Sequence, residues 1–285
     1  MAANFYVAPE QLMKDRAEYA RKGIARGRAL VAVEFAHGVV FAGENPSASL
    51  HKTSEIYDSI GFAAVGRYNE FEALRVAGIR LADVKGYQYA REDVTAKPLA
   101  NAYSQALGAS FMGETKPFEV ELLIAQVDAS HSDGGGASSG PPATGQQDDE
   151  ETDAHDPDDE TTSNETDAHD PDDAHDPDDA EAGAETGIAG GLELFHILYD
   201  GSIVDEHRFV AIGGDTEPLR AKLQERFLPG MDRDSAVRAA VGALSDVAGR
   251  TLKAEVLEVS GLDARRPRRR FFRLAVDELT AILDA

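Results

Sequence analysis

The sequence contains no cysteine, no tryptophan and no long run of apolar residues. Without cysteine, the chain can form no disulfide bridge, no thiolate metal site and no cysteine nucleophile. Its apolar runs fall well short of the roughly 18 residues that cross a bilayer, so we expect no membrane segment. The first ten residues lack a basic stretch followed by an apolar core, which excludes a typical secretion signal. We therefore expect a soluble protein located in the cytoplasm.

Basic residues are also scarce, at 28 Lys and Arg against 52 Asp and Glu, and one segment causes most of this imbalance. Residues 128–186 contain 21 acidic residues and no Lys or Arg, whereas the rest of the chain is close to neutral. The segment repeats the octapeptide TDAHDPDD at 152–159 and 166–173. Such a composition buries too little apolar surface to offset its ordering entropy. We expect a long disordered acidic insertion over residues 128–190.

The repeat places His155, His169 and His175 among carboxylates, which are ligand types for zinc and for hard cations. However, the spacing does not match an EF-hand loop, and no glycine stands at the turn position. We expect a solvated segment without a defined metal site. An acidic cation-binding protein remains an alternative function.

Outside the insertion, strand-like patterns come in groups and helical patterns come mostly in pairs. Asp200-Gly201 is a strong two-residue turn between the strand-like runs 192–199 and 203–212. The insertion is then an enlarged hairpin connection at the opposite strand end, which costs little closure entropy. This order predicts an α+β fold of two stacked antiparallel sheets with helices outside. Helices are expected at 9–26, 216–227, 234–248 and the C-terminal end. Two more are expected to begin at the caps Asn69, with Glu72 as its capping-box partner, and Thr95. The other expected strands cover 29–35, 38–42, 57–65 with Gly61 as a break, 118–127 and 252–259.

Short motifs occur in a distinctive order along nearly the whole chain, except the insertion. Together they resemble the alpha subunits of the bacterial proteasome found in actinobacteria. The motifs are Pro9-Glu10-Gln11, Arg21 to Arg26, Gly38 to Phe41, Glu44-Asn45-Pro46, Ser54 to Asp58, Gly61 to Ala64, Asn69-Glu70-Phe71, Lys116 to Glu121, Tyr199 to Ile203, Gly213-Gly214 and Arg266 to Arg269.

This resemblance implies a four-layer αββα sandwich of the N-terminal-nucleophile hydrolase type. One domain would be formed by residues 1–127, with a gate at 1–8 and a first helix at 9–26, and by residues 191–285, with the insertion 128–190 between them. Such subunits form homo-heptameric outer rings of the 20S core without a cofactor. They scaffold beta-subunit assembly, gate substrate entry and dock an AAA ATPase ring. The substrates implied are proteins that carry a ubiquitin-like tag.

The residues at the first strand argue against catalysis by this chain. An N-terminal nucleophile needs a hydroxyl or thiol at a freed strand start, with its own amine as the base. Here the corresponding strand opens with Gly27-Arg28-Ala29, and no Gly-x-Ser-x-Gly elbow occurs. We expect a non-catalytic subunit of a threonine-type endopeptidase complex. An autonomous N-terminal-nucleophile hydrolase is the second alternative.

The resemblance also indicates candidate functional residues. It implies that Lys52 lines an activator-docking pocket, where an ammonium can pair with a terminal carboxylate. Phe5, Tyr6 and Val7 precede the first helix and would form an apolar pore gate. The Tyr-Asp-Arg gate motif of archaeal and eukaryotic alpha subunits is absent, so their latch is not expected here. A surface lysine and a frayed terminus are the alternative interpretations.

The stretch 265–273 contains six arginines and two phenylalanines, which superficially suits nucleic acid. However, Phe271 and Phe272 fit the apolar positions of a strand, and the acidic protein as a whole disfavours attraction to phosphate. We expect no nucleic-acid partner. The stretch is instead expected to be a solvated turn that attracts the acidic insertion of the same or a neighbouring chain.

Overall fold

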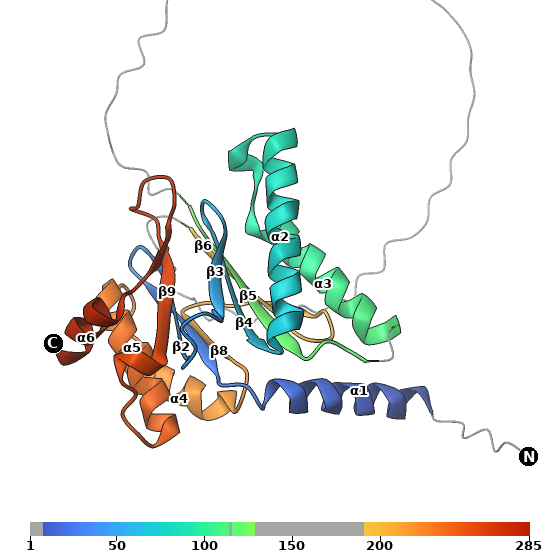
Figure 1. Cartoon of the computed structure of the whole chain (residues 1–285), viewed down its shortest axis with the longest axis horizontal. Coiled ribbons are helices and arrows are strands. Elements are labelled where there is room, and N and C mark those ends of the chain that lie inside the picture. Colours follow the sequence, from blue (N-terminus) through green and yellow to red (C-terminus); the bar gives the residue numbers. More distant parts are fainter. Residues whose placement is uncertain (1–7, 114–115, 129–190) are drawn as a thin grey trace, which may run out of the picture. The chain divides into compact units, whose positions relative to one another are not determined.

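A computed structural model of the chain describes residues 8–113, 116–128 and 191–285 (Figure 1). The predicted gate residues Phe5, Tyr6 and Val7 lie outside these ranges, as does nearly all of the predicted insertion 128–190. Those predictions therefore have no structural test here.

Ten strands form two five-stranded sheets in the described residues, and every neighbouring pair is antiparallel. The first sheet has the order β10-β9-β2-β1-β8, and the second has the order β3-β4-β5-β6-β7. The strands are β1 (Leu30–Phe35), β2 (Gly38–Glu44), β3 (Thr53–Tyr57), β4 (Ile60–Gly66), β5 (Val120–Val127), β6 (Leu192–Ile197), β7 (Ile203–Asp205), β8 (Phe209–Ile212), β9 (Leu257–Asp263) and β10 (Phe271–Arg273).

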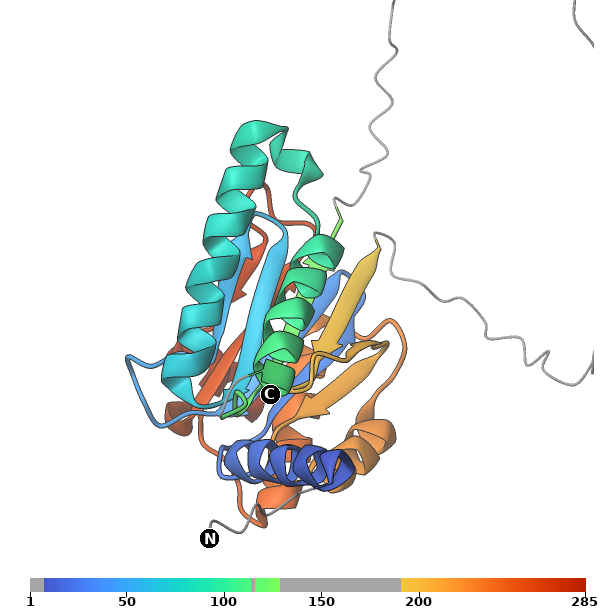
Figure 2. The ribbon, with the colours of Figure 1, turned by 90° about the vertical axis from the view of Figure 1, so that its right-hand side faces the viewer.

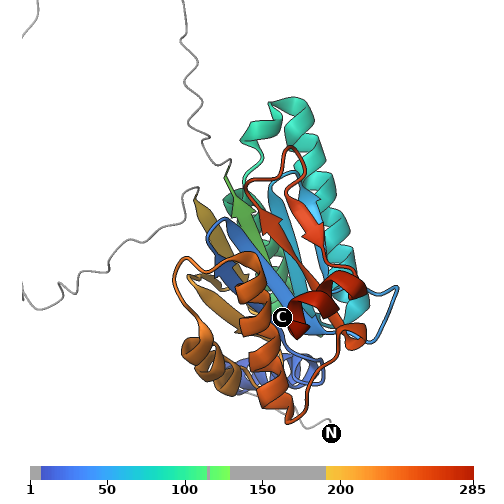
Figure 3. The same ribbon diagram turned by 90° about the vertical axis from the view of Figure 1, so that its left-hand side faces the viewer.

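Helices cover the outer faces of both sheets, as the sequence predicts. Figure 2 shows α2 (Tyr68–Gln88) and α3 (Ala96–Gly113) in front of the second sheet, with η1 (Arg91–Asp93) between them in sequence. Figure 3 shows α5 (Arg233–Ala248) and α6 (Val276–Asp284) over the first sheet. The helix α4 (Thr216–Arg226) also packs on the first sheet, through Leu219 and Leu223.

Three apolar clusters correspond to the three interfaces of a four-layer sandwich. One joins α4, α5 and α6 to the first sheet, and another joins α2 and α3 to the second sheet. The third lies between the sheets, where Phe41 and Leu262 of one sheet share a cluster with Leu123 of the other. Burying this apolar surface is the main force that holds the layers together. The predicted αββα class is confirmed.

The helix α1 (Pro9–Ile24) packs against the sandwich through one side only. Ala20 and Ile24 are buried in the cluster between the sheets, whereas Leu12 and Tyr19 are exposed by 44% and 48%. Pro9 at the first turn and Glu10 near the positive helix end suit the observed start. The predicted helix is confirmed, although it ends at Ile24 rather than at Arg26.

The predicted hairpin around the insertion is confirmed at its base. The strands β5 and β6 pair antiparallel from Leu122 with Ile197 to Val127 with Leu192. The backbone N–H of Asp128 then donates to the carbonyl of Gly191 at 3.1 Å. Asp200-Gly201 turns the chain at the other end of β6, and Gly201 has φ +88. A left-handed glycine is suited to this tight turn.

Four local predictions are wrong. The run 203–212 is not one strand, because Arg208 has φ +68 and the chain changes sheets there: β7 pairs with β6, and β8 pairs with β1. Gly61 is not a break but lies inside β4. A Cβ there would be 3.2 Å from Phe41, so the missing side chain lets the two sheets approach.

The other two errors concern element starts. The helix α2 begins at Tyr68 after Arg67, without a capping side chain, and Glu72 pairs with Arg75 instead of forming a capping box with Asn69. The strand β9 begins at Leu257 after the 3₁₀ turn η2 (Ala254–Val256). Leu252 and Ala254 are buried by helix packing, which imitates the alternation of a strand.

Candidate functional site

A buried carboxylate on β9 organises the region around Lys52. Oε2 of Glu258 accepts hydrogen bonds from Nδ2 of Asn45 at 2.6 Å and from the Lys52 backbone N–H at 3.0 Å. Oε1 accepts from the N–H of Thr53 at 3.1 Å, from its hydroxyl at 2.6 Å and from Nη1 of Arg273 at 2.5 Å. Burial by itself would raise the pKa of Glu258, but these donors outweigh burial and hold the pKa below its usual value. The carboxylate is therefore a charged, fully bonded anchor.

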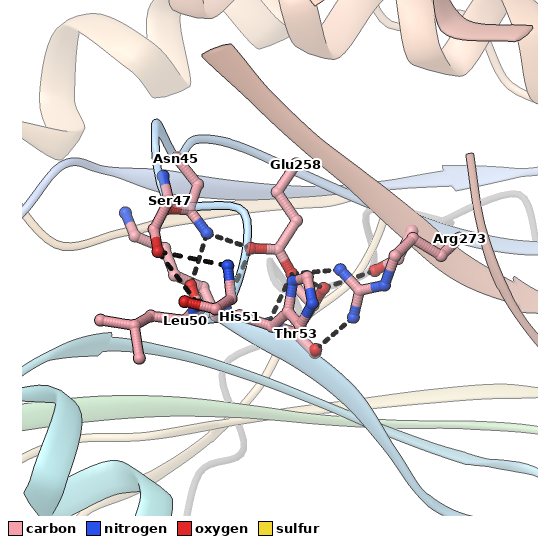
Figure 4. Close-up of polar contacts among 10 residues, drawn as sticks. Asn45, Ser47, Leu50, His51, Thr53, Glu258 and Arg273 are labelled. Atoms are coloured by element: carbon pink, nitrogen blue, oxygen red, sulfur yellow. Dashed lines mark hydrogen bonds and ion pairs between the residues drawn. The ribbon is translucent and has the colours of Figure 1, made fainter. Parts of the chain in front are cut away.

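This anchor fixes the loop between β2 and β3. Nδ2 of Asn45 also donates to the carbonyl of Leu50 at 2.7 Å, and Oδ1 of Asn45 accepts from the N–H of Ser47 at 3.1 Å. The hydroxyl of Ser47 accepts from the N–H of Leu50 at 3.0 Å. Figure 4 shows these loop residues beside Glu258, to which Asn45 also donates. The loop is thus held by side chains, as an Asx-type turn is.

The same network joins the two sheets at one edge. Thr53 begins β3 of the second sheet, while Glu258 and Arg273 belong to β9 and β10 of the first (Figure 4). Nη2 of Arg273 donates to the carbonyl of Thr53 at 2.7 Å, and the hydroxyl of Ser260 donates to that of Thr53 at 2.8 Å. The carboxylate of Glu258, the hydroxyls of Thr53 and Ser260 and the guanidinium of Arg273 are thus all hydrogen-bonded, which favours one fixed arrangement. The hydroxyl of Ser54, next along β3, has no partner among the described residues.

The ammonium of Lys52 is directed toward the start of the first strand. Nζ of Lys52 donates to the backbone carbonyl of Arg28 at 2.8 Å, and the side chain is only partly exposed. Burial lowers the pKa of Lys52 to about 8, against the opposing attraction of Glu258. One ammonium nitrogen has three donors, and the carbonyl of Arg28 uses one. The remaining N–H groups of the ammonium can donate to an anionic oxygen of a ligand.

Further charges surround this lysine. Glu44, at the end of β2, pairs with Nε of Arg28 at 3.2 Å and with Nη2 of Arg250 at 2.6 Å. The charge of Arg28 lowers the pKa of Lys52, and that of Glu44 raises it, after the larger effects of burial and Glu258. Arginine side chains on the rim and one lysine inside suit recognition of a carboxylate.

The residues before β1 carry no nucleophile. Gly27, Arg28 and Ala29 have neither hydroxyl nor thiol, and β1 begins at Leu30. Lys52 therefore contacts a backbone carbonyl at this position and not a reactive side chain. This arrangement can bind an anion, and the residues directly before β1 offer no hydroxyl or thiol as a nucleophile.

A second titratable cluster lies between β5, β6 and α4. Nε2 of His196 is 3.7 Å from Oε2 of Glu121, and Nδ1 is 3.6 Å from Oε1 of Glu206. Nη2 of Arg220 reaches Glu206 at 3.5 Å. Burial would lower the pKa of His196, but the two carboxylates outweigh it and raise the pKa. Its Nε2 has no hydrogen-bond partner among the described residues.

Sequence reasoning finds Lys52 but misses Glu258, Asn45, Arg273 and His196. In the sequence, Asn45 was noted only as part of a motif of the family resemblance, and Arg273 only as one arginine of the stretch 265–273. The available signal is Glu258 itself, a charged residue in the middle of an apolar strand pattern, because buried charges are rare without partners. Its partners in the loop lie more than 200 positions away along the chain.

The described residues contain no group of three or more His, Asp or Glu placed to hold a metal ion. Within those same ranges, no helix has both the length and the apolar character needed to cross a bilayer. The histidines of the acidic repeat lie outside the described residues, so the cation-binding alternative is not tested.

The fold and the site define a class first: a four-layer αββα sandwich of the kind seen in N-terminal-nucleophile hydrolases, in which residues 27–29 before the first strand carry no hydroxyl or thiol. A family model described as proteasome subunit matches residues 24–145 and 184–260. The chain belongs to the proteasome subunit family.

Its relatives are alpha subunits. The chain is 44% identical to proteasome subunit alpha of Geodermatophilus obscurus, with 100% of this chain and 82% of the relative aligned. It is 44% identical to that of Kineococcus radiotolerans, with 99% and 98% aligned. For that of Streptomyces avermitilis the identity is 43%, with 100% and 92% aligned. The predicted resemblance is confirmed over nearly the full chain.

Proposed function

We propose that this chain forms a homo-heptameric outer ring of a 20S proteasome core in the cytoplasm, where it acts without catalytic chemistry of its own. The ring scaffolds beta-subunit assembly, gates substrate entry and docks an AAA ATPase ring that delivers proteins carrying a ubiquitin-like tag. The proposal is supported by the relatives, which are named proteasome subunit alpha at 43–44% identity.

The observation that carries the docking role is the position of Lys52. Its ammonium sits at a rigid, hydrogen-bonded edge and keeps donors for an anionic ligand. The C-terminal carboxylate of an activator tail is such a ligand, and a short extended peptide can enter beside a surface loop. With a pKa near 8, Lys52 is largely charged at pH 7 and largely neutral above pH 9.

Exposed apolar side chains in the C-terminal half of α2 and just beyond it support the proposed assembly with other proteins. Leu81, Val84, Tyr87 and Tyr89 are exposed by 43%, 53%, 91% and 71%. They follow one another along α2 and its C-terminal end. Large apolar side chains left exposed at short intervals along a helix suit protein–protein contacts, and tyrosine is enriched at such contacts.

Replacing Lys52 tests the docking role. We expect Lys52→Ala to weaken binding of a tail peptide with a free C-terminal carboxylate at least tenfold in the assembled core, because the pairing charge is lost. Lys52→Arg should retain most of the binding. Wild-type binding should also fall as the pH rises from 7 to 9, with little change for Lys52→Ala.

The controls separate docking from folding. Lys253→Ala removes an exposed lysine and should leave binding unchanged. An amidated tail peptide should bind wild type no better than it binds Lys52→Ala. If Lys52→Ala destroys the ring in native mass measurements, Lys52 has a structural role; equal binding by wild type and Lys52→Ala contradicts the docking role.

The gate formed by Phe5, Tyr6 and Val7 stays a proposal that rests on sequence. Deleting residues 1–8 should speed hydrolysis of a short fluorogenic peptide by the assembled core severalfold. The matched control replaces the three apolar residues by serine and keeps the length; it should also speed hydrolysis if their apolar character closes the pore. An unchanged rate in both variants contradicts the gate.

A further inference from the structure

The side chain of His196 lies on the face of the second sheet that is turned toward the first sheet. Along β6, Leu194 belongs to the apolar cluster between the sheets, whereas Phe195 belongs to the cluster beneath α2 and α3. Successive side chains of a strand point to opposite faces, so His196 shares the inner face with Leu194. By the same alternation, Glu121 on β5 shares this face with Leu123. A histidine and a carboxylate, both largely buried, therefore face the first sheet.

The contacts of His196 lead to both ends of β8. Oε2 of Glu121, which is 3.7 Å from Nε2 of His196, accepts a hydrogen bond from the N–H of Gly213 at 3.2 Å. Gly213 directly follows β8. Oε1 of Glu206 lies 3.6 Å from Nδ1 of His196, and Glu206 belongs to the short crossover that leads into β8. The two carboxylates thus link the second sheet to the residues just before and just after β8.

The strand β8 depends in part on such links because it lies at the edge of the first sheet. Among the described strands it pairs only with β1, from Val33 with Phe209 to Leu30 with Ile212. Elements with few hydrogen-bonded neighbours open locally more often than the centre of a sheet. A change in the links at its ends should therefore change how often β8 opens, while the central strands stay closed.

The charge of His196 decides how many carboxylates it can attract. A charged imidazole donates from both nitrogens, whereas a neutral one has one donor and one acceptor. Only the charged form can therefore attract Glu121 and Glu206 at once. In the neutral form, one of these carboxylates faces a ring nitrogen that repels it. Nε2 of His196 has no hydrogen-bond partner among the described residues, so no group there replaces the lost attraction at this nitrogen.

The other charged and titratable groups that face this cluster come from the crossover, α4, α1 and the turn after β6: His207, Arg220, Arg21 and Tyr199. Nη2 of Arg220 lies 3.5 Å from Oε2 of Glu206. Arginine keeps its proton in proteins, and burial raises the pKa of Tyr199, so these groups do not change charge near pH 7. Of the two histidines, His196 lies between both carboxylates.

We propose that His196 is a proton-operated clamp on β8. In its charged form, His196 holds Glu121 and Glu206 and fastens both ends of the strand to the second sheet. In its neutral form, it lets these ends open. The clamp goes beyond the proposed proteasome function and does not depend on it.

The direction of the pH dependence follows from the surroundings of His196. Burial by itself would lower the pKa of His196, but the two carboxylates outweigh burial and raise it above the ordinary 6.5. The clamp is therefore closed below pH 6.5 and opens as the pH rises through the folded value.

Opening of β8 reaches the start of β1, with which it shares a ladder. In the turn after β8, a Cβ on Gly214 would lie 3.7 Å from the Cβ of Ala29. The carbonyl of the preceding residue, Arg28, accepts from Nζ of Lys52 at 2.8 Å. The clamp thus makes the backbone beside Lys52 depend on the charge of a histidine in the other sheet.

Hydrogen exchange of the full chain, measured by mass spectrometry at pH 6 and pH 8.5, tests the clamp. Protection is expressed relative to the intrinsic exchange rate at each pH. In wild type, we expect the protection of residues 209–216 to fall at least fivefold between the two pH values, and that of residues 28–31 to fall with it. His196→Gln should have low protection at both pH values. His196→Arg should keep high protection at both, because a guanidinium stays charged and has several donors.

Matched positions and variants separate the clamp from general unfolding. Residues 257–263 on β9 are the internal reference and should keep the same protection. Glu206→Gln leaves one carboxylate for His196 and should remove most of the pH change. Its control, Glu217→Gln at an exposed position of α4, should keep the wild-type change. If His196→Arg does not fold, this pair and His196→Gln decide the question.

Four results would overturn the clamp. Equal wild-type protection of residues 209–216 at both pH values, or an unchanged pH dependence in His196→Gln, shows that the charge of His196 does not hold β8. An equal loss over residues 257–263 shows that the whole fold responds rather than β8. Removal of the pH change by His207→Gln alone assigns the response to His207.

Discussion

Two polar clusters of this molecule, around Glu258 and around His196, compensate in different ways for the cost of burying a charged group. Glu258 is buried and accepts bonds from Asn45, Thr53, Arg273 and the Lys52 backbone. His196 lies between two carboxylates at 3.6 and 3.7 Å, beyond good hydrogen-bond distance. The first cluster is saturated with donors. In the second, burial would lower the pKa of His196 but the two carboxylates raise it, so their attraction depends on the proton of the imidazole.

The difference shows which edge of the sandwich can hold a functional side chain in a constant position. A saturated network keeps its geometry over a wide pH range, so the loop that carries Lys52 is held in place. A histidine, in contrast, is the side chain whose charge changes near physiological pH. We therefore expect the Glu258 edge to be stable and the His196 edge to respond to pH.

The largest expected effect is that of Glu258→Ala. It leaves buried donors and the charge of Arg273 without a partner, which costs about 3–5 kcal/mol in the free energy of unfolding. Urea unfolding of the chain at pH 7 measures this change. The control Glu255→Ala removes an exposed glutamate nearby in sequence and should change stability by less than about 0.5 kcal/mol.

The contribution of Glu258 to the free energy of unfolding should depend on pH. Because the folded pKa of Glu258 is lowered, its stabilisation is present above the unfolded value of 4.5 and is lost as pH falls through the folded value. The stability difference between wild type and Glu258→Ala should therefore shrink on acidification below pH 4.5. A difference that stays constant down to acid unfolding would show that the charge of Glu258 does not contribute.

A smaller effect is expected for Thr53→Val. Valine keeps the shape but removes the hydroxyl that donates to Glu258 and accepts from Ser260. The loss should cost about 2 kcal/mol, with the fold unchanged. Thr251→Val, at an exposed threonine, is the matched control. Equal stability of the two variants would contradict a cooperative network at this edge.

The smallest effect is expected for His196→Gln, about 1 kcal/mol at pH 6. The raised pKa of His196 means that its contribution is complete below 6.5 and is lost as pH rises through the folded value. The groups that face it are Glu121, Glu206 and Arg220. The stability gap between wild type and variant should close toward pH 9. A gap that stays constant from pH 6 to pH 9 would show that the charge of His196 does not contribute.

Local patterns predicted much of the fold but little of the site. The hairpin β1–β2, the turn at Asp200-Gly201 and the helices α1, α4 and α5 follow from periodicity and turn chemistry. The division at Arg208 was missed although four consecutive polar residues, 205–208, separate two apolar stretches. The sequence does not show, however, that these stretches pair in different sheets. For the site, Lys52 was predicted only through resemblance. Its contact with the carbonyl of Arg28 depends on how β1 and β3 are placed in different sheets.

The sequence by itself determined the acidic segment, the absence of a nucleophile before the first strand and the alternation that separates sheets from helices, because composition and period are properties of consecutive residues. Only the tertiary structure decided that Glu258 meets Thr53 and Asn45, that His196 lies between Glu121 and Glu206, and that Arg270 donates to the carbonyl of Val127 at the end of β5. These contacts join residues distant in sequence, and such pairings are set by how the two sheets stack and by which side chains the stacking removes from water.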